Sequence, residues 1–137
     1  MNRVADVQAR FIEFADRPWP QRLDAFRDVE VGPFGERTDM LAMQRSASAE
    51  SVRQEARNAA LLRNARIAIA IERARASNTT PAIPNLIDPY SGEPLLIKRD
   101  AVSYVVYSVG QNGRDDGGHT TLDITLRPLP ATLFANP

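Results

Sequence analysis

The spacing of apolar residues changes near Pro94, and this change constrains the fold more than any other feature of the sequence. Upstream of Pro94, apolar residues recur at the three- and four-residue spacing of amphipathic helices. Downstream, apolar and polar residues alternate, and β-branched and aromatic residues are frequent, as in strands. The sequence therefore predicts an α+β protein, in which a long N-terminal helical part packs on a small antiparallel sheet.

Two short amphipathic helices and one long helix are predicted before the sheet. The first spans residues 2–16 and ends before the Pro18–Pro20 segment, because proline cannot continue the hydrogen-bond ladder of a helix. The second spans about residues 20–29. The long helix is expected to begin at one of three serines that can cap it and to run through about Ser77, without an internal glycine or proline. The serines are Ser46, Ser48 and Ser51.

The later turns of the long helix are nearly apolar around much of their circumference, so its C-terminal half is expected to be the buried half. The residues that carry this prediction are Leu61, Leu62, Ala65, Ala68, Ile69 and Ala70. Prolines at positions 81, 84 and 89 then predict an extended connection. Three antiparallel strands are predicted after it, at Leu95–Lys98, Ser103–Val109 and Leu122–Leu126.

Composition excludes several classes of function. The chain has 17 Lys and Arg against 17 Asp and Glu, so its net charge predicts no nucleic-acid partner. It has no cysteine, which removes disulfides, thiolate catalysis and cysteine metal ligands. No apolar run approaches the roughly 18 residues that a membrane span needs, and the N-terminus lacks a signal-peptide core.

The loop between the second and third predicted strands, GQNGRDDGGHTT, contains candidate metal ligands. Asn112, Asp115, Asp116 and Asp123 supply hard oxygen atoms, and glycines let backbone carbonyl groups turn inward. Calcium takes about six to eight such oxygens. Asp and Asn side chains also satisfy the backbone of their own loops, which is the alternative interpretation.

An enzymatic alternative is a hydrolase centred on His119, Asp115 and Asp116. His119 is the one histidine of the chain, and it lies beside the acidic loop. The sequence has no nucleophile-elbow, phosphate-loop or zinc-protease motif. Adjacent acids in a glycine-rich loop seldom hold two carboxylates in fixed opposition across a substrate. The chain is therefore predicted to be non-enzymatic.

The order of segments adds a resemblance. A long helix precedes DPYSGEP, a hairpin ends in YSVGQNG, and LDI follows the acidic glycine-rich loop. This pattern resembles the C-terminal region of the major pseudopilins of type II secretion, with their DPWGNPY-like, SLGADG-like and ADI-like segments. The resemblance covers about residues 52–126 and is most specific over 88–124.

The resemblance implies a pilin-like fold, with a helical spine against a small antiparallel sheet and a calcium ion that stabilises the last loop. Carried over by position, the Val109 carbonyl oxygen and the Asn112 and Asp123 side chains would be ligands. Asp115 and Asp116 lie in the variable part of the loop as nearby candidates. The chain departs from the family because Asn112 stands where the family has an acid. It also has amphipathic helices in place of the family's apolar N-terminal helix.

Residues 17–118 are also similar to uncharacterised bacterial envelope proteins with DPFSGKPL-like and YSVGPNGxDDGG-like segments. Together the resemblances imply a helical extension at 1–47 and a pilin-like domain at 48–137. They imply a periplasmic or cell-envelope location, and protein partners in the envelope or secretion apparatus. Membrane attachment would need an anchor that this sequence lacks, and oligomerisation stays open. The alternative is an interaction module that uses its N-terminal amphipathic helices, with a metal-free loop.

Overall fold

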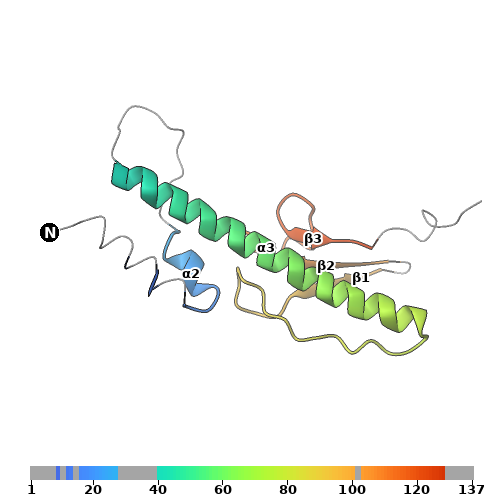
Figure 1. The fold of residues 1–137 in the computed structure, drawn as a ribbon. Helices are drawn as coiled ribbons and strands as arrows, with labels where there is room; N and C mark the ends of the chain where they lie inside the picture. The colour runs from blue at the N-terminus through green and yellow to red at the C-terminus, as the bar shows by residue number, and fades with distance from the viewer. Residues whose placement is uncertain (1–8, 10–11, 14–15, 28–39, 101–102, 129–137) are drawn as a thin grey trace, which may run out of the picture. The chain divides into compact units, whose positions relative to one another are not determined.

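The computed structural model describes residues 9, 12–13, 16–27, 40–100 and 103–128 (Figure 1). Contacts divide the chain into two compact units, Met1–Asn58 and Ala59–Pro137. The predicted boundary after residue 47 stays a prediction. The predicted helix at 2–16 falls mostly outside the described residues.

In the first unit, α2 (Gln21–Asp24) is shorter than the helix predicted at about 20–29. The helix ends early because the backbone continues as turns after Asp24. In these turns the Phe26 amide donates to the Leu23 carbonyl oxygen at 3.0 Å. Two arginines join this segment to α3. Arg22 pairs with Glu55 at 2.8 Å, and Arg53 donates to the Phe26 carbonyl oxygen at 3.2 Å.

The long helix, α3 (Met40–Ala76), begins earlier than predicted and continues through the three serines that were expected to cap it. Serine favours helix N-termini, but inside a helix its hydroxyl can donate to the carbonyl group of the preceding turn. Ser51 does so, donating to the Ala47 carbonyl oxygen at 2.9 Å. Within the described residues, no helix is long and apolar enough to cross a membrane.

Burial along α3 corrects the prediction that the C-terminal half is the buried half. Ala49, Val52 and Ala56 in the N-terminal half are also buried. In the C-terminal half, Leu62 and Ile69 are 67% and 51% exposed. The helical period of about 3.6 residues explains this result, because it directs apolar residues at neighbouring positions to different sides of the helix.

The second unit contains the sheet, which consists of β1 (Leu96–Arg99), β2 (Tyr104–Ser108) and β3 (Ile124–Leu126). The strands pair in the order β1-β2-β3, and both pairs are antiparallel. Val106 in the central strand lies opposite Ile97 on one side and Leu126 on the other. The α+β class and the three-stranded antiparallel sheet are thus confirmed.

One hydrophobic cluster joins the C-terminal half of α3 to the sheet. Its buried members are Ile67, Ala68, Ile71, Leu95, Tyr104 and Val106. Within this unit, the helix runs along the sheet in Figure 1. Two alanines of this half of α3 are buried as well, and such small side chains let a helix and a sheet approach closely.

Replacing Ile67 with alanine is expected to lower the free energy of unfolding by about 3 kcal/mol, because the truncation leaves a cavity in a close-packed cluster. Ile67 is only 2% exposed. Ile69→Ala is the matched control on the same helix, with an expected change of about 0.5 kcal/mol or less. Urea unfolding measures both variants. Equal losses would contradict the described direction of the buried face.

Candidate functional site

The segment 109–123, which we call the glycine loop, covers the face of the sheet opposite α3. Tyr104 and Val106 point to the helix cluster, so the alternation of a strand turns Val105 and Tyr107 to the other face. A Cβ atom added at Gly118 would lie 3.0 Å from the Val105 side chain and 3.4 Å from the Tyr107 ring. The loop therefore covers β2 closely, and all five residues of β2 are buried.

Three side chains from the sheet side hold the glycine loop in place. Lys98 of β1 donates to the Gly117 carbonyl oxygen at 3.2 Å. The Tyr107 hydroxyl of β2 donates to Asp115 at 3.0 Å. Arg127, which follows β3, donates to the Gly118 carbonyl oxygen at 3.3 Å. The loop is thus attached from the central strand and from both flanks of the sheet.

Three of the five predicted metal ligands are exposed, and their side chains bond within the loop or to the sheet. The Asn112 side chain accepts from the Arg114 amide at 3.0 Å and donates to Asp116 at 2.6 Å. Asp115 accepts from the Gly117 amide at 2.9 Å. This is the chemistry expected for a loop whose acidic and amide side chains satisfy its own backbone.

Asp123 is different, because one of its two carboxylate oxygens has no hydrogen-bond partner among the described residues. The side chain is buried, and its Oδ2 atom accepts from the Gly118 and His119 amides at 2.8 Å each. Its Oδ1 atom is buried and accepts no hydrogen bond from the described residues. A buried carboxylate oxygen without a donor is costly, and a cation would satisfy it.

The fifth predicted ligand, Val109, lies at the opposite end of the loop. Its amide donates to Asp88 at 2.9 Å. The next residue, Gly110, contacts the chain next to Asp123: an added Cβ atom would lie 2.6 Å from the Leu122 carbonyl oxygen. The structure thus brings the two ends of the loop together. Among the described residues, no three His, Asp or Glu side chains gather closely enough to hold a metal ion.

Sequence reasoning missed Asp88 as a residue with a role of its own. Asp88 is 1% exposed and accepts three hydrogen bonds: from the Tyr90 amide at 2.9 Å, the Ser108 hydroxyl at 2.7 Å and the Val109 amide at 2.9 Å. It joins the proline-rich connection to the end of β2. The available signal was an acid directly before a Pro-Tyr-Ser-Gly turn, where Asp often binds the backbone two residues on.

Asn64 was also missed. It lies fully buried on α3, and its side-chain amide donates to the Ile124 carbonyl oxygen at 2.7 Å. Its Oδ1 atom is buried and has no hydrogen-bond partner among the described residues. The signal was an Asn within a run of strong helix formers, where a buried polar side chain needs a specific partner.

The residues of the hydrolase alternative have other partners. His119 is exposed, and its Nδ1 atom lies 3.0 Å from the Thr121 hydroxyl. Asp115 binds Tyr107 and the Gly117 amide, and Asp116 accepts from Asn112. The described contacts therefore pair His119 with a threonine rather than with either acid.

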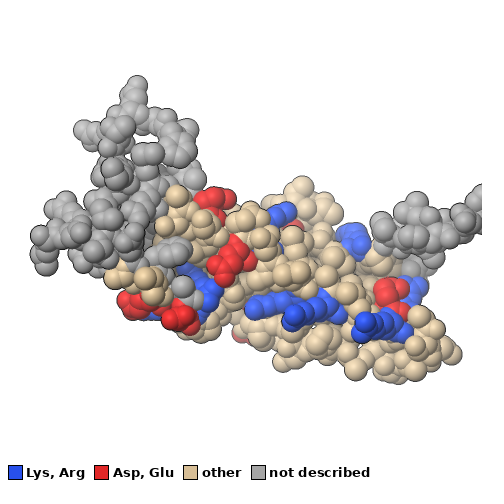
Figure 2. Space-filling model, in the orientation of Figure 1, with Lys and Arg blue, Asp and Glu red and all other residues tan. Residues whose placement is uncertain are grey.

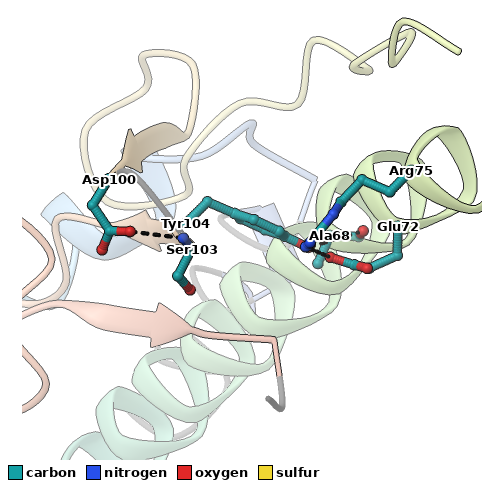
Figure 3. A network of polar contacts seen from close by, with 6 residues as sticks. All are labelled: Ala68, Glu72, Arg75, Asp100, Ser103 and Tyr104. Carbon is teal, nitrogen blue, oxygen red and sulfur yellow. Dashed lines mark hydrogen bonds and ion pairs between the residues drawn. The ribbon is translucent and has the colours of Figure 1, made fainter. Parts of the chain in front are cut away.

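Two tyrosines of β2 have raised pKa values. Burial raises the pKa of Tyr107 to about 12, and the hydrogen bond to Asp115 adds to this effect. Burial also raises the pKa of Tyr104 to about 12, followed by the effect of Glu72. Figure 3 shows the Tyr104 hydroxyl directed at α3, where it donates to the Ala68 carbonyl oxygen at 3.3 Å. Glu72 lies beside it and pairs with Arg75 at 3.3 Å.

These pKa values predict a loss of stability at alkaline pH. The folded state keeps both phenol protons until about pH 12, whereas an unfolded tyrosine releases its proton near pH 10. The stabilisation is complete below pH 10 and is lost as the pH rises towards 12. Urea unfolding at stepped pH values should show this loss, and Tyr107→Phe should reduce it. An unchanged pH slope in Tyr107→Phe would contradict the burial of this hydroxyl.

No family model, no curated protein and no solved structure matches this chain.

Proposed function

We propose that this chain is a non-enzymatic, pilin-like domain of a bacterial cell-envelope or secretion apparatus, with a glycine loop that calcium stabilises. The support comes from the order of its parts: a long helix, a proline-rich connection, a hairpin, an acidic loop and a closing strand. In the second unit the helix packs on a three-stranded antiparallel sheet. This arrangement agrees with the expectation from the pseudopilin-like segments at 88–124.

The calcium part of the proposal rests on the Oδ1 atom of Asp123, which is buried and has no hydrogen-bond partner in the part of the chain that the structure describes. Asp123 would hold the ion, with the Val109 carbonyl group as the ligand from the other end of the loop. Asn112, Asp115 and Asp116 would contribute only if they gave up their present hydrogen bonds. A bound calcium ion would supply positive charge to a buried carboxylate and link the two ends of the loop. In this proposal the calcium ion has a structural role, and the protein catalyses no reaction.

Calcium is therefore expected to raise the melting temperature of the chain. A ligand at one hundred times its dissociation constant stabilises the folded state by about 2.7 kcal/mol. Asp123→Asn should abolish the calcium-dependent rise in melting temperature, because it removes the negative charge of the carboxylate that would bind the ion. Thermal unfolding with calcium or with a chelator measures the effect, and titration calorimetry reports binding directly.

Two controls sharpen the experiment. Magnesium should give little stabilisation, because it demands near-octahedral geometry and loses its water reluctantly. Asp116→Asn should keep most of the calcium response, since Asp116 is exposed and engaged by Asn112. If the melting temperature is identical with calcium and with chelator, and no heat of binding is measured, the calcium part of the proposal is wrong. The proposal of a non-enzymatic, pilin-like domain would not be affected by that result.

A metal-free interaction module is the second candidate, and a specific observation favours it. Lys98 and Arg127 already bring positive charge to the carbonyl groups of Gly117 and Gly118. In this version the glycine loop needs no ion, and the N-terminal amphipathic helices contact a protein partner. Cross-linking and light scattering test it. A strict monomer that keeps all partner binding after deletion of residues 1–30 would reject this candidate.

A further inference from the structure

The exposed side of the C-terminal half of α3 carries a mixture of apolar and basic side chains. Leu62, Arg66, Ile69 and Arg73 are spaced by four, three and four residues, so they form one line along the helix, which we call the outer stripe. All four are exposed, and Leu62 and Ile69 are among the most exposed large apolar residues described. The stripe alternates apolar and cationic groups.

The two cations of the outer stripe have no acidic partner among the described residues. Within the described residues, neither Arg66 nor Arg73 forms an ion pair. Glu72, the nearest acid along this half of the helix, is engaged by Arg75. Figure 2 shows basic side chains in a row over the C-terminal half of α3, with few acidic ones beside them. An acidic partner would thus meet positive charge that no residue of the described chain neutralises.

The outer stripe continues into an apolar groove. This groove has a volume of about 390 Å³ and lies between the last turns of α3 and the side chains of Tyr104 and Pro128. Ile69 and Arg73 belong both to the stripe and to the groove. The exposed isoleucine is therefore part of a concave apolar surface, whose lining also includes Arg73 and Glu72, the latter paired with Arg75.

We propose that the outer stripe and its groove bind an amphipathic helix of another protein, whose apolar residues are flanked by Asp or Glu. The apolar positions 62 and 69 lie seven residues apart, which is the repeat with which one helix packs along another. Carboxylates on the partner would pair with Arg66 and Arg73. This surface is independent of the glycine loop, so its test does not depend on calcium binding.

The positions of the two arginines argue against two other partners for the outer stripe, a second copy of this chain and a membrane surface. A second copy of this stripe would place four uncompensated cations in one interface, in either orientation. A membrane surface is also a poor fit, because interfacial helices separate an apolar face from a cationic face. In the outer stripe, however, the arginines alternate with the apolar residues on the same line. Burial of Leu62 and Ile69 among acyl chains would therefore also bury the two guanidinium groups.

The test uses the full chain and two synthetic helical peptides with leucine at seven-residue spacing. One peptide carries Glu at the flanking positions, and the other carries Lys there. Fluorescence anisotropy should show that the acidic peptide binds about tenfold more tightly than the basic one. The double variant R66E/R73E should reverse this preference, and L62N/I69N should weaken the binding of the acidic peptide about tenfold or more.

The matched control is R99E/R114E, which changes the net charge equally at two exposed residues outside α3. Thermal unfolding checks that each variant folds. Equal binding of the two peptides, or the same loss in R99E/R114E as in R66E/R73E, would overturn the proposal. So would binding to phosphatidylcholine–phosphatidylserine vesicles that depends on Leu62 and Ile69 while the acidic peptide fails to bind.

Discussion

Asp88→Ala is expected to lower the free energy of unfolding by about 3–5 kcal/mol. Both carboxylate oxygens of Asp88 accept hydrogen bonds, and the substitution leaves the Ser108 hydroxyl and the Val109 amide buried without an acceptor. A buried donor that loses its acceptor is still removed from water, so its desolvation energy is no longer offset by a hydrogen bond. The alanine side chain cannot accept one. Urea unfolding measures the change.

Asp116→Ala is the control for Asp88→Ala, since Asp116 is exposed and has Asn112 as its hydrogen-bond partner. The expected change is about 0.5 kcal/mol or less. Asp88→Asn should fall between the two, because an amide keeps one acceptor oxygen and turns an NH₂ group towards the other donors. If Asp116→Ala and Asp88→Ala lowered the free energy of unfolding by similar amounts, the hydrogen bonds by which Asp88 links the proline-rich connection to the end of β2 would not be important for stability.

Gly110→Ala is expected to cost about 3 kcal/mol or more, from two separable causes. Gly110 has φ +67°, a conformation that costs an L-residue about 1 kcal/mol. Its added Cβ atom would also lie 2.6 Å from the Leu122 carbonyl oxygen, so the backbone of one end of the glycine loop must shift. Thermal and urea unfolding both report the loss.

Gly113→Ala isolates the first of these causes. Gly113 also has φ +67°, but an added Cβ atom meets nothing within 4 Å. The expected loss is about 1 kcal/mol, from backbone conformation alone. The difference between the two variants therefore measures the close approach of Gly110 to Leu122. Equal losses would show that the two ends of the loop do not touch.

The local chemistry of the sequence was enough to predict the sheet. The β-branched and aromatic content of SYVVYSV, the alternation of Leu122, Ile124 and Leu126, and the change of period after Pro94 placed all three strands to within two residues. Helix ends were harder to predict. Ser46, Ser48 and Ser51 are good capping residues, yet α3 runs through them, because each also fits inside a helix at small cost.

The candidate site was harder to predict than the fold, for a physical reason. A sequence shows which side chains carry oxygen atoms, but not which donors reach them. Asn112 and Asp116 bind each other, whereas Asp123 has a buried oxygen that no described residue bonds. For Asp88, the turn after it indicates a bond to the Tyr90 amide, but its bond to Ser108, twenty residues away in sequence, is seen only in the fold. Long-range pairing of this kind leaves no local spacing pattern.

The sheet has two short edge strands, and both are poor templates for the addition of a further strand. β1 has four residues and ends in the exposed Lys98 and Arg99. β3 has three residues, followed by Arg127 and Pro128, and proline has no amide to donate. Charged, short and proline-terminated edges oppose edge-to-edge aggregation. Self-assembly through continuous backbone pairing, as in amyloid, is thus disfavoured, which leaves side-chain surfaces such as the exposed residues of α3 as the route by which this unit can associate.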